Sequence, residues 1–160
     1  MEQHSMRVET FGGLAVWLDG QLLVRRGERI NKNLELLALL ALNGRAPLSN
    51  EALAGLLWTE EESHNPAGAL KNAAYSLRRL LEQRGVEREL VTVEDKQYRL
   101  APDLSLEVDL WQAGRLAEQA VNQPDKALAL AAWEELDGIC CGDFLPQLAD
   151  RPWVAGQAAL

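Results

Sequence analysis

The sequence predicts an α+β fold: an N-terminal winged helix-turn-helix domain with a small antiparallel sheet and a C-terminal wing, followed by an all-α, tetratricopeptide-like region. Three observations support this prediction. Residues 31–84 contain three apolar, helix-periodic segments separated by turn residues, and the last of them is strongly amphipathic. Residues 90–100 have the pattern of a short β-hairpin. Paired helical patterns follow, so we place the first domain over residues 6–103 and the start of a second over residues 104–160.

The first predicted elements are short strands. Residues 6–24 alternate apolar and polar side chains, and the dipeptides Gly12-Gly13 and Asp19-Gly20 interrupt the alternation. Such dipeptides are typical of hairpin turns, so this region should form a small antiparallel sheet. The arginine-rich connector at residues 25–29 fits a loop near DNA and a solvated loop equally well.

Two helices should follow these strands. The first covers residues 32–42, is apolar on most sides and ends at Asn43-Gly44, a dipeptide that favours a helix C-terminus. The second covers residues 48–58 and has Ser49 as its N-cap. The side chains that should face the core from this second helix are Leu53, Leu56, Leu57 and Trp58.

The third helix, at residues 65–84, has two sharply different faces. Asn65 and Pro66 mark its start, and Gly85 marks its end. At about 100° per residue, four apolar side chains fall within about 60° of Leu70 and complete a core-facing stripe; they are Ala73, Ala74, Leu77 and Leu81. The opposite face carries hydrogen-bond donors, namely Lys71, Asn72, Tyr75 and Arg79, with Arg78 on the flank.

This donor-rich face is suited to the major groove of duplex DNA. Arginine and lysine read guanine edges or bind phosphates, asparagine can pair bidentately with adenine, and tyrosine can reach phosphate or stack. A solvated helix face is the general alternative for such a run of charges. The position of the helix, after two shorter helices and before a hairpin, favours the DNA-binding interpretation.

An acidic loop at residues 59–64 connects the second and third helices. It contains three adjacent carboxylates, Glu60, Glu61 and Glu62. Because phosphates repel carboxylates, this loop should point away from a duplex, either into solvent or toward a protein partner.

The hairpin should form the wing of the domain. Its predicted strands cover residues 90–93 and 98–100, joined by residues 94–97. Lys96 and Arg99 are the wing residues expected to contact the phosphate backbone. The neighbouring acidic pair Glu94-Asp95 would weaken insertion of the tip into a minor groove.

The C-terminal part of the sequence predicts closely packed helices. Residues 109–121 and a segment from Pro124 to about residue 136 are rich in alanine and leucine at helical spacing. Such antiparallel pairs are the unit of tetratricopeptide arrays, which need about three repeats to bury a continuous core. A further helix should start near Arg151, so we expect the natural protein to continue beyond Leu160.

The net charge of −8 is unevenly distributed along the chain. Residues 1–103 hold 13 Lys and Arg against 15 Asp and Glu, whereas residues 104–160 hold 3 against 9. Residues 65–84 hold four basic side chains and one acidic side chain, so positive charge is focused on the third helix. The acidic total implies that DNA affinity must accumulate through dimerisation or tandem sites.

The sequence lacks the residues that several classes of function need. The sequence has no glycine-rich phosphate loop, nucleophile elbow, metal-ligand cluster or histidine-based catalytic pair, so we expect no enzyme, metal or cofactor. The vicinal Cys140 and Cys141 indicate a reducing compartment and should be buried in apolar packing. With no apolar segment of about 20 residues and no signal sequence, we expect a cytoplasmic protein without a membrane anchor.

Six segments follow one another over about 130 residues, in the order LLALLALNGRAPLSNEALAGLLW, ALKNAAYSLRRLL, LVTVEDKQYRL, VDLW, GDFL and PW. In these segments the chain resembles the bacterial transcriptional activator domain (BTAD) regulators, which include the SARP activators of antibiotic pathways. The resemblance implies a winged helix like that of response regulators, an activator region of tetratricopeptide type, and transcription activation. The sequence departs from the family at Gln97, which stands where glycine usually precedes the wing tyrosine.

Carried over by position, the resemblance assigns roles to individual residues. Lys71, Asn72, Tyr75 and Arg79, with Arg78 beside them, would enter the major groove, and Lys96 and Arg99 would meet the adjacent backbone. The loop at residues 59–64 would face RNA polymerase. We therefore expect a DNA-binding transcriptional regulator, with homodimerisation as a further expectation. The alternative is a protein-interaction module whose winged helix no longer binds DNA.

Overall fold

The computed structural model describes residues 4–44, 46–58, 65–140, 142–151 and 153–154. The chain divides into two compact units, each built from two separate segments. The first unit consists of Met1–Ser5 and Arg29–Leu106, and the second of Met6–Glu28 and Glu107–Leu160.

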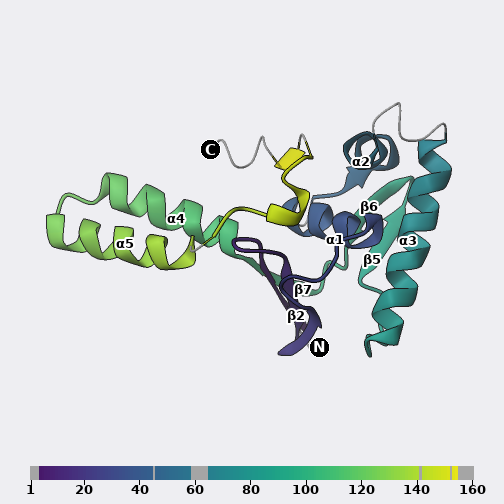
Figure 1. Cartoon of the computed structure of the whole chain (residues 1–160), viewed down its shortest axis with the longest axis horizontal. Coiled ribbons are helices and arrows are strands. Elements are labelled where there is room, and N and C mark those ends of the chain that lie inside the picture. The colour runs from purple at the N-terminus through teal and green to yellow at the C-terminus, as the bar shows by residue number, and fades with distance from the viewer. Residues whose placement is uncertain (1–3, 45, 59–64, 141, 152, 155–160) are drawn as a thin grey trace. The chain divides into compact units, whose positions relative to one another are not determined.

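Among its described residues, the first unit contains helices and a small sheet (Figure 1). Its helices are α1 (Lys32–Leu42), α2 (Asn50–Leu57) and α3 (Pro66–Gln83). Strands β4 (Leu48–Ser49), β6 (Gln97–Leu100) and β5 (Val91–Glu94) follow one another in that order across an antiparallel sheet. Helix α3 packs against both α1 and α2. The three predicted helices and the predicted hairpin are confirmed as elements.

Local capping explains where these helices begin and end. Ser49 Oγ accepts a hydrogen bond from the amide of Ala52 at 3.1 Å, and Asn65 Oδ1 accepts one from the amide of Gly68 at 3.2 Å. Both side chains satisfy amides that the first helical turn leaves without partners. Gly85 follows α3 with φ of +92°, a conformation that glycine adopts without steric cost.

The apolar stripe of α3 lies in the core of the first unit. Leu70, Leu77 and Leu81 are buried together with Ala73, whereas the predicted stripe residue Ala74 is half-buried. Helix α1 supplies the other side of this core with a continuous run of buried residues from Leu34 to Ala41. Burial of the leucines on one side leaves the donor-bearing side of α3 exposed to solvent.

Two side chains of α2 lie outside the core, contrary to the prediction. Leu56 is 38% exposed, because the eight-residue helix presents only Leu53, Ala54 and Leu57 to the core. Trp58 is half-buried at the C-cap of α2, with Lys32 Nζ 5.7 Å from its ring centroid. Lys32 also donates a hydrogen bond to the carbonyl of Leu57 and forms an ion pair with the buried Glu35.

The wing turn is tighter than the sequence predicted. Strands β5 and β6 pair as far as Glu94 and Gln97, so the connection consists of Asp95 and Lys96 alone. Both residues have positive φ, +51° and +62°, as a two-residue hairpin turn of this hand requires. Because side chains disfavour this conformation, the turn is held by strand pairing on either side of it.

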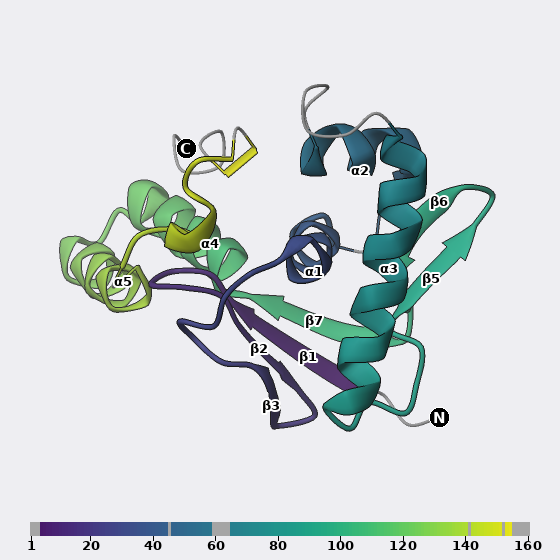
Figure 2. The same cartoon turned by 45° about the vertical axis from the view of Figure 1, so that its right-hand side comes forward.

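The four-stranded sheet has the order β3-β2-β1-β7 (Figure 2). Its strands are β1 (His4–Glu9), β2 (Ala15–Leu18), β3 (Gln21–Val24) and β7 (Leu104–Val108). Asp19 and Gly20, both with positive φ, form the turn between β2 and β3. The prediction of short antiparallel strands over residues 6–24 is confirmed.

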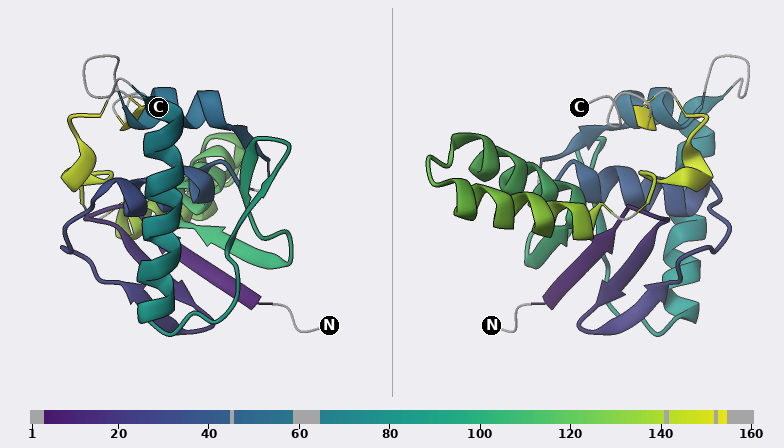
Figure 3. Two further views of the ribbon diagram at one scale, coloured as in Figure 1. Left: turned by 90° about the vertical axis from the view of Figure 1, so that its right-hand side faces the viewer. Right: turned by 60° about the vertical axis from the view of Figure 1, so that its left-hand side comes forward.

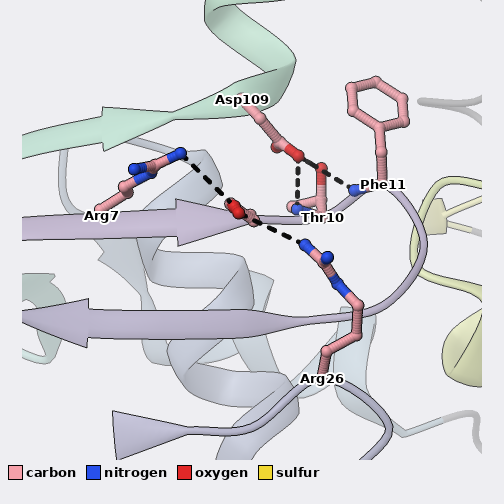
Figure 4. A network of polar contacts seen from close by, with 6 residues as sticks. Arg7, Thr10, Phe11, Arg26 and Asp109 are labelled. Atoms are coloured by element: carbon pink, nitrogen blue, oxygen red, sulfur yellow. Dashed lines mark hydrogen bonds and ion pairs between the residues drawn. The ribbon is translucent and has the colours of Figure 1, made fainter. Parts of the chain in front are cut away.

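Asp109 ties the end of β1 to the start of the C-terminal helices (Figure 4). Its carboxylate accepts hydrogen bonds from the amide of Thr10 at 2.7 Å, the hydroxyl of Thr10 at 2.6 Å and the amide of Phe11 at 3.0 Å. Thr10 is fully buried, so this carboxylate satisfies polar groups that have no access to water.

The GDFL segment is held against the same part of the chain. The amide of Leu145 donates to the carbonyl of Thr10 at 2.9 Å, and the rings of Phe11 and Phe144 meet edge to face. At Gly142, an added Cβ would lie 2.7 Å from the Cα of Gly12, so only glycine fits this approach. The sequence placed residues 6–28 in the domain 6–103, whereas these contacts group them with residues 107–160.

Helices α4 (Asp109–Asn122) and α5 (Lys126–Ile139) lie side by side as an antiparallel pair (Figure 3). Helix α4 buries Ala113, Leu116 and Ala120, but α5 buries none of its residues. Asp125 caps α5, so this helix begins two residues after Pro124, and it ends beyond the predicted boundary. Cys140 is exposed at its C-cap, contrary to the predicted burial, because α5 has no core on that side; Cys141 lies outside the described residues.

We expect Leu77→Ala to lower the free energy of unfolding by about 2–5 kcal/mol, because it opens a cavity in the core of the first unit. Leu56→Ala is the matched control, since it removes the same atoms from a partly exposed site of the same unit. Chemical denaturation of both variants provides the measurement. Equal unfolding midpoints for Leu77→Ala and the parent would show that the core face of α3 is assigned wrongly.

We expect Asp109→Asn to destabilise the protein by about 1.5–3 kcal/mol, the usual worth of a hydrogen bond to a charged group. An amide has one acceptor oxygen, which can keep the amides of Thr10 and Phe11 because both donate to the same carboxylate oxygen. The NH₂ group would then replace the oxygen that accepts from the Thr10 hydroxyl, and the charge that strengthens all three hydrogen bonds would be lost. Glu107→Gln, at an exposed site two residues earlier, is the control for the change of charge. Thermal unfolding in which both variants behave alike would remove Asp109 from this structural role.

Candidate nucleic-acid interface

The candidate interface is the exposed side of α3. Lys71, Asn72, Tyr75, Arg78 and Arg79 are all exposed, and Tyr75 retains 64% of its accessible surface. The structure thus presents every side chain predicted for the groove to solvent.

These residues follow the axis of α3. With a rise of about 1.5 Å per residue, Lys71 and Arg79 are separated by about 12 Å along the helix, a little over two turns. Tyr75 lies between them on the same side, since the three residues are spaced by four. A B-form major groove is about 12 Å wide and admits an α-helix.

The basic side chains of this face differ in their ionic partners. Arg78 Nε lies 3.5 Å from Glu82 Oε1, one helical turn further along α3. Within the part of the chain that the structure describes, Lys71 and Arg79 form no ion pair. The positive charges of Lys71 and Arg79 are therefore available to a ligand, whereas that of Arg78 is compensated.

A polar contact with α1 holds helix α3 in addition to its buried leucines. Asn33 Nδ2 of α1 donates a hydrogen bond to Ser76 Oγ at 3.1 Å. At about 100° per residue, Ser76 lies about 40° from Asn72, so this exposed contact lies at the edge of the donor-rich face. Together with the apolar stripe, it limits rotation of α3 about its own axis.

The wing places its two predicted contact residues differently. Lys96 is exposed at the turn, whereas Arg99 is half-buried on β6, opposite Thr92. A hollow of about 250 Å³ beside Arg99 is lined by Glu94 and Asp95, among other residues. These carboxylates make the surroundings of Arg99 unfavourable for a phosphate.

The tyrosine of the wing is a core residue. Tyr98 is buried on β6, and desolvation by burial raises the pKa of its phenol above the ordinary value. It therefore remains neutral across the physiological range and belongs to the core rather than to the exposed surface.

A groove of about 300 Å³ runs between α3 and the segment that leads into β5. Leu77, Leu81 and Leu90 contribute to its apolar lining, while Arg78 and Glu82 line it from α3. Arg88, from the opposite side, donates to Asp103 at 2.7 Å. This hydrogen bond and the positive charge of Arg88 lower the pKa of the Asp103 carboxyl.

The ion pair between Arg78 and Glu82 was not predicted from the sequence. Glu82 was counted there only as one negative charge within residues 65–84. Its spacing of four from Arg78 was the available signal, because side chains at i and i+4 meet on a helix surface. The partnership of Arg88 with Asp103 had no such local signal, since 15 residues separate them.

The other predicted features lie outside the interface or outside the described residues. Glu60, Glu61 and Glu62 lie in residues 59–64, which are not among the described residues. No group of three or more acidic, histidine or cysteine side chains in the described ranges is arranged to hold a metal ion. None of the described helices is both long and apolar enough to cross a bilayer.

No protein-family model and no curated protein matches this sequence. Among solved structures, the chain is similar to Mycobacterium tuberculosis EmbR in complex with a low affinity phosphopeptide, with a TM-score of 0.65 and 20% sequence identity. The match covers 98% of this chain and 41% of the EmbR chain. The chain therefore shares a mixed α+β fold with that part of EmbR.

Proposed function

We propose that this protein is a DNA-binding transcriptional regulator, most simply an activator, and that α3 is its reading helix. The observation that carries the proposal is the row of exposed donors on α3, backed by a buried leucine stripe. The shared fold with the regulator EmbR supports the same function. In this proposal the fold is a winged helix-turn-helix followed by a tetratricopeptide-like helical region.

The chemistry of each side chain suggests its task on the duplex. Lys71 and Arg79 have no competing ion pair among the described residues and would bind phosphates or guanine edges. Asn72 would pair with adenine, because its amide offers a donor and an acceptor side by side. Tyr75 would donate to a phosphate or contact an apolar part of the groove.

The wing contributes less than α3 in this proposal. Lys96 is exposed at the turn and would meet the phosphate backbone beside the groove. Arg99 would contribute weakly, since it is half-buried and shares its hollow with Glu94 and Asp95. This division of roles follows from charge, because carboxylates at a wing tip oppose its approach to phosphates.

The partners proposed for the rest of the chain follow from the same function. An activator must reach the transcription machinery, and the acidic loop with Glu60, Glu61 and Glu62 is proposed to face RNA polymerase. The helical region would serve as an interaction module without a catalytic role. As a regulator of transcription, the protein would act in the cytoplasm. With a net charge of −8, binding would depend on a homodimer or on tandem sites.

A protein-docking module with an inactive winged helix is the second candidate. The acidic wing and the compensated charge of Arg78 are the observations that favour it. A docking surface need not respond to salt in the way that a phosphate-binding surface does. Salt dependence therefore separates the two candidates.

We expect the protein to bind duplex DNA of mixed sequence at low salt, with affinity falling steeply as salt rises. Contacts of Lys71, Arg79 and Lys96 with phosphates would give a slope of about −3 in a plot of log Kobs against log salt, at about −0.9 for each contact. Fluorescence anisotropy over a salt series provides the measurement. Absence of binding at low salt would favour the docking module.

We expect Arg79→Ala to weaken binding to a selected duplex by about 1–3 kcal/mol and to relax preference at one base pair, if Arg79 reads a base edge. A uniform loss across sequences would assign Arg79 to a phosphate instead. Arg115→Ala, at an exposed site on α4, is the control. Sequence selection from a randomised duplex pool, followed by affinity measurement, distinguishes these results. Arg79→Ala binding like Arg115→Ala would remove Arg79 from the interface.

A further inference from the structure

We propose that Glu82 weakens sequence-independent DNA binding by holding the guanidinium of Arg78 in an ion pair on the reading face. This inference rests on the proposed DNA-binding function and concerns the selectivity of that same surface. It assigns Glu82 as a specificity-determining residue of α3, although its charge opposes that of DNA.

The geometry places Glu82 among the donors rather than behind them. At about 100° per residue, Glu82 lies about 120° from Leu70, between the directions of Lys71 and Tyr75. Arg78 Nε is 3.5 Å from Glu82 Oε1, and the two side chains are 66% and 54% exposed. A phosphate that approached Arg78 would have to displace this carboxylate or accept its repulsion.

Helix stability does not account for the pair. An acidic residue four positions before a basic one is the favourable order on a helix, and here the order is reversed. Glu82 also lies in the last turn of α3, which ends at Gln83, where a negative charge opposes the helix dipole. Exposed ion pairs of this kind contribute little to folding, so the carboxylate has its main effect on what Arg78 can bind.

Further acidic side chains near Arg78 also reduce the positive charge on its side of α3. Glu87 and Glu89 line the same groove as Arg78, and the guanidinium of Arg88 is bonded to Asp103. On α3, phosphate binding is thereby left to Lys71 and Arg79. Because phosphate contacts supply most non-specific affinity, restraining Arg78 lowers binding to random DNA more than binding that depends on base contacts.

A double-mutant cycle on Arg78 and Glu82 tests the inference with duplex DNA of random sequence as the probe. We expect Glu82→Gln to bind about fivefold more tightly at low salt and to steepen the salt slope by about 0.9, the contribution of one phosphate contact. In an Arg78→Gln background, Glu82→Gln should change affinity by less than about twofold. Loss of the effect in that background identifies Arg78 as the group that Glu82 restrains.

Glu134→Gln, at an exposed site on α5, controls for the change in net charge, and thermal unfolding confirms that each variant is folded. An equal gain from Glu82→Gln in both backgrounds would show simple repulsion and overturn the inference. A gain no larger than that of Glu134→Gln would also overturn it, while the DNA-binding function would stand. Failure of the parent protein to bind DNA at low salt would overturn both.

Discussion

The packing of α3 against α1 and α2 is the constraint on which the proposed function depends. Leu70, Leu77 and Leu81 are buried at spacings of seven and four, so the helix has one rotational setting that satisfies its apolar surface. That setting directs Lys71, Tyr75 and neighbouring donors outward. Their exposure is therefore a consequence of core packing, and a helix free to rotate would not present a fixed set of donors.

A second constraint operates in the other compact unit. The carboxylate of Asp109 gathers donors from Thr10 and Phe11, and the segment around Phe144 pairs with the same residues. Parts of the chain separated by about 100 residues thus share one structural unit. The N-terminal strands and the C-terminal helices therefore belong to one compact unit, and the compact units do not follow chain order.

The candidate interface combines attraction with restraint. Basic side chains on α3 are partly compensated by Glu82, and the wing carries its own carboxylates beside Arg99. In the proposed function, a surface of this composition would gain less from phosphates and would rely more on contacts with base edges. The strongly acidic chain and the local compensation act in the same direction, since both reduce affinity for arbitrary nucleic acid.

The sequence by itself determined the positions of α1, α2 and α3 and the amphipathic character of α3, because periodicity, caps and terminal glycines act within a few residues. It also identified the exposed donors of the candidate site. Tertiary structure alone decided the exposure of Leu56 and Cys140, the association of Asp109 with Thr10, and the pairing of Arg88 with Asp103. Burial and long-range hydrogen bonds depend on which surfaces meet in three dimensions, and local sequence patterns carry no record of that.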